Sequence, residues 1–221
     1  MVMGAIGNAR KWKEDLFPYE LIPEIIELII NSWKTFKKPD RLDLEVPISR
    51  AFTKKLQYEK NSQNSLPFKI RPELVTYGTD EDKDSDGRID ICFDYIGTPD
   101  EETYFALECK RLRIPYPPPS NLATNNSDYV GEQGMMCFIT GKYSRNVTSG
   151  GMIGYVMDSN TKKAISSLIT LIKRKSSFLK LVKNTGLEPS AIISNYPNAK
   201  ETKYALPGKQ KFTIHHLFLA V

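Results

Sequence analysis

The chain has 221 residues, of which 40% are hydrophobic and 26% are charged, and it carries a net charge of +5. This composition fits one domain with a real hydrophobic core, and the mild positive charge permits a polyanionic partner without indicating one. No apolar run reaches membrane-spanning length, and the first residues are too short and too weakly apolar for a secretory signal. We therefore expect a cytoplasmic protein that does not enter a membrane.

Residues 10–38 are predicted to form an N-terminal helical arm, with Pro23 near a first helical position. Its apolar residues recur at helical spacing on one face: Ile22, Ile26, Ile29, Ile30 and Trp33. Packing against its own domain is the simplest use of such a stripe. An interface with another chain, to which Trp12 would also contribute, is the alternative.

A second helix is predicted to begin near Pro47, because Ile48, Phe52 and Leu56 recur every four residues. Glu45 then lies at or just before the N-terminus of this helix. A carboxylate is favoured there by the helix dipole, so capping by itself is enough to explain Glu45.

Three strands are predicted to follow, over residues 68–77, 87–96 and 102–111. The first is interrupted at Pro72, and the last two form a hairpin. The third reads as a half-buried strand, because successive side chains in a strand alternate between its faces. Glu108 and Lys110 share one face, whereas Leu107 and Cys109 share the other, which we take as the core face.

The rest of the chain alternates between helix and strand. The predicted elements are a proline-rich loop over 113–128, a helix over 128–142, a strand over 150–158, a helix over 160–175 and a last strand over 211–221. This order predicts an α/β fold with a mixed central β-sheet flanked by helices, arranged as a single domain over residues 1–221.

Acidic side chains on two neighbouring predicted strands suggest a metal site. Asp90 comes from one strand of the hairpin and Glu108 from the other, with Lys110 beside Glu108. Carboxylates from paired strands can converge on one Mg²⁺ ion, which completes its octahedron with water and substrate phosphate. A nearby lysine can orient or deprotonate an attacking water, or stabilise the developing charge.

Asp90, followed after 17 residues by Glu108-Cys109-Lys110, resembles the pattern of the PD-(D/E)XK nuclease superfamily. The resemblance covers about residues 40–175 and is closest to small stand-alone nucleases of bacterial defence and restriction systems. It implies a restriction-endonuclease-like core in which Glu45 is the accessory helix acid. Ile89 stands where the family's proline would precede the aspartate.

The resemblance implies a Mg²⁺-dependent endodeoxyribonuclease for which Mn²⁺ can substitute. Asp90 and Glu108 would hold the metal, Lys110 would position or activate water, and Glu45 would complete the outer shell. The expected partners are DNA and either a second copy of the chain or a larger protein. A non-catalytic nucleic-acid-binding or assembly subunit with this fold, and an RNase toxin, are the alternatives.

Several further residues are candidates for nucleic-acid contact, although each also reads as an ordinary solvated side chain. The main ones are Arg111, Arg113, Gln133, Lys142 and Arg145. Asp94 shares a face with Asp90 but lies one strand repeat, about 7 Å, away, so it is only an outer candidate.

The cysteines and histidines indicate no second metal site. Cys92, Cys109 and Cys137 form no CxxC pair and are expected to be reduced and buried. His215 and His216 are adjacent on a predicted strand, so they point to opposite faces, and we predict no zinc. The acidic turn at residues 82–87 imitates a calcium loop but has Phe93 where the bidentate glutamate should be.

Overall fold

The computed structural model describes residues 17–63, 66–76, 87–97, 103–115, 122–143, 147–205 and 211–221. Trp12, Arg145, the acidic turn and most of the proline cluster lie outside these ranges. The helices are α2 (Leu21–Thr35), α3 (Glu45–Ser62), α4 (Asn126–Val130), α5 (Met135–Ile139) and α6 (Thr161–Arg174). The strands are β1 (Phe68–Thr76), β2 (Gly87–Tyr95), β3 (Tyr104–Leu112), β4 (Ile114–Pro115), β5 (Leu122–Ala123), β6 (Ser149–Val156), β7 (Glu188–Pro189), β8 (Ala199–Tyr204) and β9 (Phe212–Ala220).

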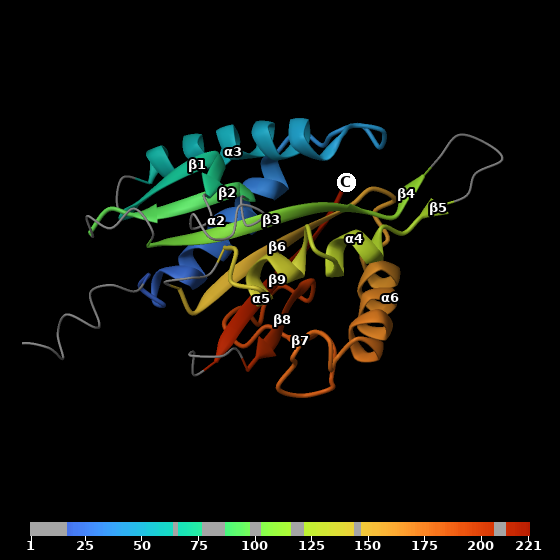
Figure 1. Cartoon of the computed structure of the whole chain (residues 1–221). Coiled ribbons are helices and arrows are strands. Elements are labelled where there is room, and N and C mark those ends of the chain that lie inside the picture. The colour runs from blue at the N-terminus through green and yellow to red at the C-terminus, as the bar shows by residue number, and fades with distance from the viewer. Residues whose placement is uncertain are drawn as a thin grey trace, which may run out of the picture.

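A seven-stranded sheet with the order β1-β2-β3-β6-β9-β8-β7 forms the centre of the molecule (Figure 1). Strands β3, β6 and β9 are parallel to one another, whereas β1-β2-β3 and β9-β8-β7 are antiparallel. The prediction of an α/β fold with a mixed sheet and flanking helices is therefore confirmed. The β2–β3 hairpin is confirmed as well.

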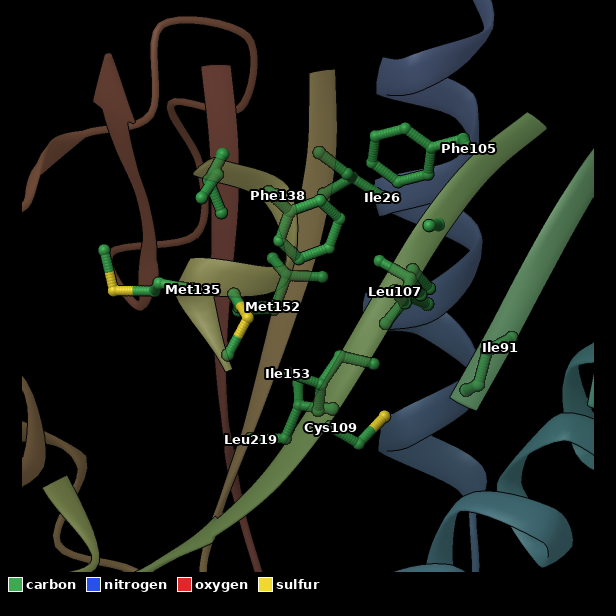
Figure 2. Close-up of a cluster of buried hydrophobic side chains, with 14 of the residues drawn as sticks. Ile26, Ile91, Phe105, Leu107, Cys109, Met135, Phe138, Met152, Ile153 and Leu219 are labelled. Atoms are coloured by element: carbon green, nitrogen blue, oxygen red, sulfur yellow. The ribbon is translucent and has the colours of Figure 1, made fainter. Parts of the chain in front are cut away.

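Strand β3 is buried on both faces, which corrects the prediction of a half-buried strand. On one face Cys109 lies beside Tyr155, whose ring stacks on Trp33 of α2 at a centroid distance of 5.5 Å. Helix α5 covers the opposite side of the sheet, where Phe138 lies against Gly150 of β6. Figure 2 shows these layers, with the ribbon of α2 on one side of the sheet and α5 on the other. The charged pair on β3 therefore lies in an interior layer.

Helix α2 belongs to this core. Its apolar stripe is buried within the chain, from Ile22 to Trp33, and the Trp33 indole Nε1 donates to the carbonyl oxygen of Ala220 at 2.9 Å. Within the described residues the helix is also shorter than the predicted arm, because it begins at Leu21 and ends at Thr35. The stripe thus packs on its own domain, as the simpler reading held, and is not an open interface.

The helix predicted over residues 128–142 is in fact two short helices, α4 and α5. The helix is interrupted over residues 131–134. A Cβ atom added to Gly134 would lie 2.2 Å from the backbone oxygen of Tyr129. The glycines were the available signal, since glycine permits such close backbone approach.

The structure differs from the prediction at two segments that contain proline. Pro72 does not end β1, which continues to Thr76, but the pairing with β2 skips the next residue, Glu73, whose φ is +52°. β1 is an edge strand, where proline is tolerated. In the proline-rich segment, Ile114–Pro115 and Leu122–Ala123 pair as a small antiparallel sheet where only a loop was expected.

Candidate functional site

The site begins where β2 and β3 stop pairing. Their antiparallel ladder runs from Asp94↔Tyr104 to Ile91↔Leu107 and ends there. At the next position the side chain of Asp90 replaces the backbone as the acceptor: its Oδ2 accepts a hydrogen bond from the backbone N–H of Cys109 at 2.8 Å. The backbone N–H of Cys109 is therefore bonded to a side chain instead of to the neighbouring strand. Asp90 and Glu108 lie at this point, where β2 and β3 separate.

Glu45, in the first turn of α3, reaches across to β3 with both carboxylate oxygens. Oε1 accepts from Lys110 Nζ at 3.0 Å, and Oε2 accepts from the backbone N–H of Arg111 at 2.9 Å. No side-chain hydrogen bond caps the N-terminus of α3. Glu45 lies in the first turn, where the helix dipole favours a carboxylate, and its carboxylate also joins the helix to the strand that carries the other candidate residues.

Lys110 is the common partner of the acidic side chains. Besides Glu45, its Nζ donates to Glu108 Oε1 at 2.6 Å and to the backbone oxygen of Cys109 at 2.9 Å. All three donor positions of the ammonium group are thus occupied. Although burial opposes it, the carboxylates of Glu108 and Glu45 raise the pKa of Lys110, so this residue remains a cation.

The carboxylates of Asp90 and Glu108 are poorly solvated. Asp90 is 7% exposed and Glu108 is 5% exposed. Burial raises the pKa of Asp90 to about 6, and burial together with the neighbouring Asp90 carboxylate raises the pKa of Glu108 to about 8. Among the described residues, Glu108 Oε2 is buried without a hydrogen-bond partner. Perturbed acids of this kind are typical of functional sites, because both carboxylates gain from an added cation.

The side chains of Glu45, Asp90, Glu108 and Lys110 line one open pocket of about 340 Å³. Its other lining residues are Val46, Gly87, Arg88, Gln133, Cys137, Lys142 and Tyr143. A larger hollow of about 570 Å³ adjoins the pocket and shares Glu45, Val46, Lys110 and Gln133 with it. The predicted residues from α3, β2 and β3 are therefore brought together at a surface that solvent and ligands can reach.

The predicted nucleic-acid contacts separate into two groups. Gln133 and Lys142 line the pocket. Arg111 lines only the adjoining hollow, where its Nη1 donates to the backbone oxygen of Asp43 at 2.9 Å. The guanidinium of Arg113 forms an ion pair with Asp158 at 2.6 Å and lines neither cavity. Arg145 lies outside the described residues.

Asp94 lies outside the site, although it shares a strand face with Asp90. Its Oδ1 accepts a hydrogen bond from Arg71 Nη2 at 2.7 Å, and it does not line the pocket. This ion pair joins the edge strand β1 to β2, so Asp94 has a structural partner.

Arg88 is a pocket residue that sequence reasoning missed. It stands two positions before Asp90 on β2 and therefore shares its face. The same alternation that selected Asp90 could have found it. Tyr143 also lines the pocket; it is buried, and its hydroxyl donates to the backbone oxygen of Arg88 at 2.8 Å.

The three cysteines are reduced and buried, as predicted. His216 is enclosed between Tyr129 and Thr202, with its Nδ1 2.9 Å from the tyrosine hydroxyl and its Nε2 2.8 Å from Thr202 Oγ1. In the described part of the chain, no three His, Cys, Asp or Glu side chains gather into a complete metal centre. Mg²⁺ sites commonly need only one or two carboxylates, with water and phosphate as the other ligands.

No helix in the described ranges is long and apolar enough to cross a bilayer. No family model matches the chain, and neither a curated protein nor a solved structure matches it. The resemblance to the PD-(D/E)XK superfamily therefore stays a prediction, and a mixed seven-stranded sheet flanked by helices is the architecture established for the chain.

Proposed function

We propose that this chain is a Mg²⁺-dependent nuclease that hydrolyses phosphodiester bonds, with DNA as the expected substrate and Mn²⁺ as a substitute metal. The restriction-endonuclease-like form of the fold, a role in bacterial defence and action as a dimer or with a larger partner belong to the same proposal.

One observation carries the proposal. Asp90, Glu108 and Lys110, which were selected from the sequence alone, line a single solvent-open pocket together with Glu45 from a distant helix. Lys110 contacts Glu45 and Glu108 directly, at 3.0 and 2.6 Å. An exposed structural ion pair would not require Asp90 and Glu108, which are only 7% and 5% exposed, to converge on the same opening.

The residues present fit a magnesium ion. Glu108 Oε2 is a buried oxygen without a partner in the described chain, and Asp90 accepts the hydrogen bond from Cys109 through Oδ2. Carboxylate oxygens are the ligands that Mg²⁺ prefers. When bound, the ion would polarise the phosphoryl group and lower the pKa of a coordinated water. Glu45 is already engaged by Lys110 and Arg111, which favours a role in holding Lys110 in place.

The ionisation of Lys110 bears on its role. Because its ammonium group is held by two carboxylates and one carbonyl oxygen, it is better suited to orient water or to stabilise negative charge than to remove a proton. Of the roles considered for Lys110, we therefore propose charge stabilisation and positioning.

The first test is metal-dependent cleavage by the purified chain. Supercoiled plasmid, linear DNA and RNA are incubated with Mg²⁺, Mn²⁺ or EDTA, and the products are examined for a 5′-phosphate. We expect cleavage of DNA with either metal and none in EDTA. Asp90→Asn and Lys110→Ala should each reduce the rate by at least about 100-fold, the scale of losing one preorganised electrostatic contact.

Asp94→Asn is the matched control, because Asp94 lies on the same strand but outside the pocket. It should keep the wild-type rate. Cleavage of RNA alone would favour the ribonuclease alternative. Activity that survives both Asp90→Asn and Lys110→Ala would place the chemistry elsewhere, and a chain that binds nucleic acid without cutting it would favour the binding-subunit alternative.

A further inference from the structure

The charges around the pocket are unevenly distributed. The carboxylates of Asp90 and Glu108 lie deep, and the charge of Lys110 is matched by Glu45 and Glu108. A phosphodiester is an anion, so cations at the mouth favour its approach to this acidic interior. Among the described residues that line the pocket, the remaining cationic side chains are Arg88 and Lys142.

The side chain of Arg88 is available for a ligand. It is 52% exposed, and the ion pair recorded for it within the described chain is a loose contact of 3.7 Å with Glu73 Oε1. The same glutamate is bound much more closely by Arg50, at 2.7 Å. Exposed pairs of this kind contribute little, so exchanging Glu73 for a phosphate would cost Arg88 little.

The backbone of Arg88 is nevertheless firmly positioned. Its carbonyl oxygen accepts the 2.8 Å hydrogen bond from Tyr143, whose ring packs edge-on against Phe138 at a centroid distance of 5.6 Å. The backbone N–H of Tyr143 donates to Cys137 at 3.0 Å and closes the turn after α5 that carries Lys142. Tyr143 therefore ties together the two segments that present cations to the pocket.

The other arginines near the site are less suitable. Arg111 opens into the adjoining hollow, whose lining includes Asp128 and Glu132, and Arg113 is paired with Asp158. In the hollow, Arg111 and Lys110 lie among three carboxylates, those of Glu45, Asp128 and Glu132. The pocket instead adds two further cations, Arg88 and Lys142, and these favour the approach of a polyanionic backbone from their side.

We propose that Arg88 and Lys142, held in place by Tyr143, form a phosphate-binding rim that receives the nucleic-acid backbone next to the bond to be cut. This inference rests on the proposed nuclease function and adds to it the side from which the substrate enters. It keeps Lys142 among the expected phosphate contacts and replaces Arg111 and Arg113 with Arg88.

The test measures binding without cleavage. A fluorescently labelled DNA duplex and a labelled single strand are titrated in EDTA, with fluorescence anisotropy recorded at several salt concentrations. Arg88→Gln and Lys142→Gln should each weaken binding at least about threefold at low salt. Each should also lower the slope of log affinity against log salt by about 0.7–0.9, because one phosphate contact is lost.

Two further variants separate position from charge. Tyr143→Phe keeps the ring but loses the hydrogen bond to Arg88, so it should weaken binding while leaving the salt slope unchanged. Arg174→Gln, at the end of α6 and outside the pocket, should bind like the wild type. Thermal unfolding of each variant checks that it is folded.

The outcomes distinguish this inference from the proposed function. Wild-type affinity and salt slope in both Arg88→Gln and Lys142→Gln would overturn the rim, even if the chain cleaves DNA. Binding that depends on both residues without metal-dependent cleavage would overturn the nuclease and keep the rim. A wild-type chain that binds neither the duplex nor the single strand would overturn the rim directly.

Discussion

At the scale of single residues, Glu108 has the least favourable environment in the site. It is 5% exposed, with one oxygen on Lys110 and the other without a partner among the described residues. A buried carboxylate in such surroundings costs folding free energy when it is ionised. This destabilisation lies at the place where a bound cation or substrate would offset it, as is common at functional sites.

The ionisation of Glu108 predicts a pH dependence of stability. Its pKa is raised from 4.5 to about 8, so between these values the folded chain binds more protons than the unfolded chain. The free energy of unfolding should therefore fall as the pH rises through this window when metal is absent. Asp90, whose pKa is raised from 3.8 to about 6, adds to the fall at the lower end.

Glu108→Gln tests this prediction by urea unfolding in EDTA from pH 5 to pH 9. The amide still accepts from Lys110 but cannot ionise. At pH 9 the variant should be more stable than the wild type by on the order of 1–3 kcal/mol, since one pKa unit corresponds to about 1.4 kcal/mol, and the gain should shrink towards pH 5. Glu24→Gln, which changes an exposed residue of α2, should retain the wild-type pH profile. A parallel course for Glu108→Gln and the wild type would contradict the assignment.

At the scale of elements, the break between α4 and α5 shapes the wall of the pocket that carries Gln133 and Cys137. The break depends on Gly134, because an added Cβ would lie 2.2 Å from the backbone oxygen of Tyr129 and 2.4 Å from that of Asp128. These are backbone atoms, so a side-chain rotation cannot relieve the clash.

Gly134→Ala should therefore destabilise the chain by at least about 2 kcal/mol, as measured by urea unfolding, and should reduce cleavage through displacement of the pocket wall. Gly141→Ala is the comparison variant. Gly141 has a φ of +89° with no atom within 4 Å of an added Cβ, so alanine there should cost only the left-handed backbone penalty of about 1–2 kcal/mol. Equal effects of the two substitutions would show that the close approach at Gly134 is relieved elsewhere.

At the scale of the whole molecule, the last strand occupies a central place in the sheet. Strand β9 pairs with β6 on one side and β8 on the other, and its carbonyl at Ala220 accepts the hydrogen bond from Trp33 of α2. The segment that resembles the nuclease family, residues 40–175, therefore leaves out both a helix and a strand that complete the same core. Folding should be cooperative over all of them.

Phe218→Ala tests this cooperativity. Phe218 is fully buried on β9 and stacks on Tyr129 of α4 at 5.9 Å, so its truncation should cost about 3–5 kcal/mol. Tryptophan fluorescence and far-UV circular dichroism should report one shifted transition. Phe178→Ala, at a position 59% exposed, should change stability by no more than about 0.5 kcal/mol. Two separate transitions in Phe218→Ala would indicate that the core of 40–175 folds independently of β9.

The sequence by itself determined the strong local features. Alternation along β2 and β3 indicated the hairpin, helical spacing indicated α3 and α6, and together they selected Asp90, Glu108, Lys110 and Glu45. The predictions of these helices and of the hairpin succeeded because side-chain periodicity is a property of neighbouring residues. Sequence periodicity also identified the apolar stripe of α2, although it left open which surface the stripe covers.

Only the tertiary structure decided what depends on contacts between distant segments. It buried both faces of β3, placed β9 beside β6, and joined Glu45 to Lys110 across 65 positions of the chain. It also paired Arg113 with Asp158 while leaving Arg88 at the mouth of the pocket. Charge and periodicity are local, whereas the partner that a charged side chain meets is set by the packing of the whole sheet, and that packing gives each of these residues its role.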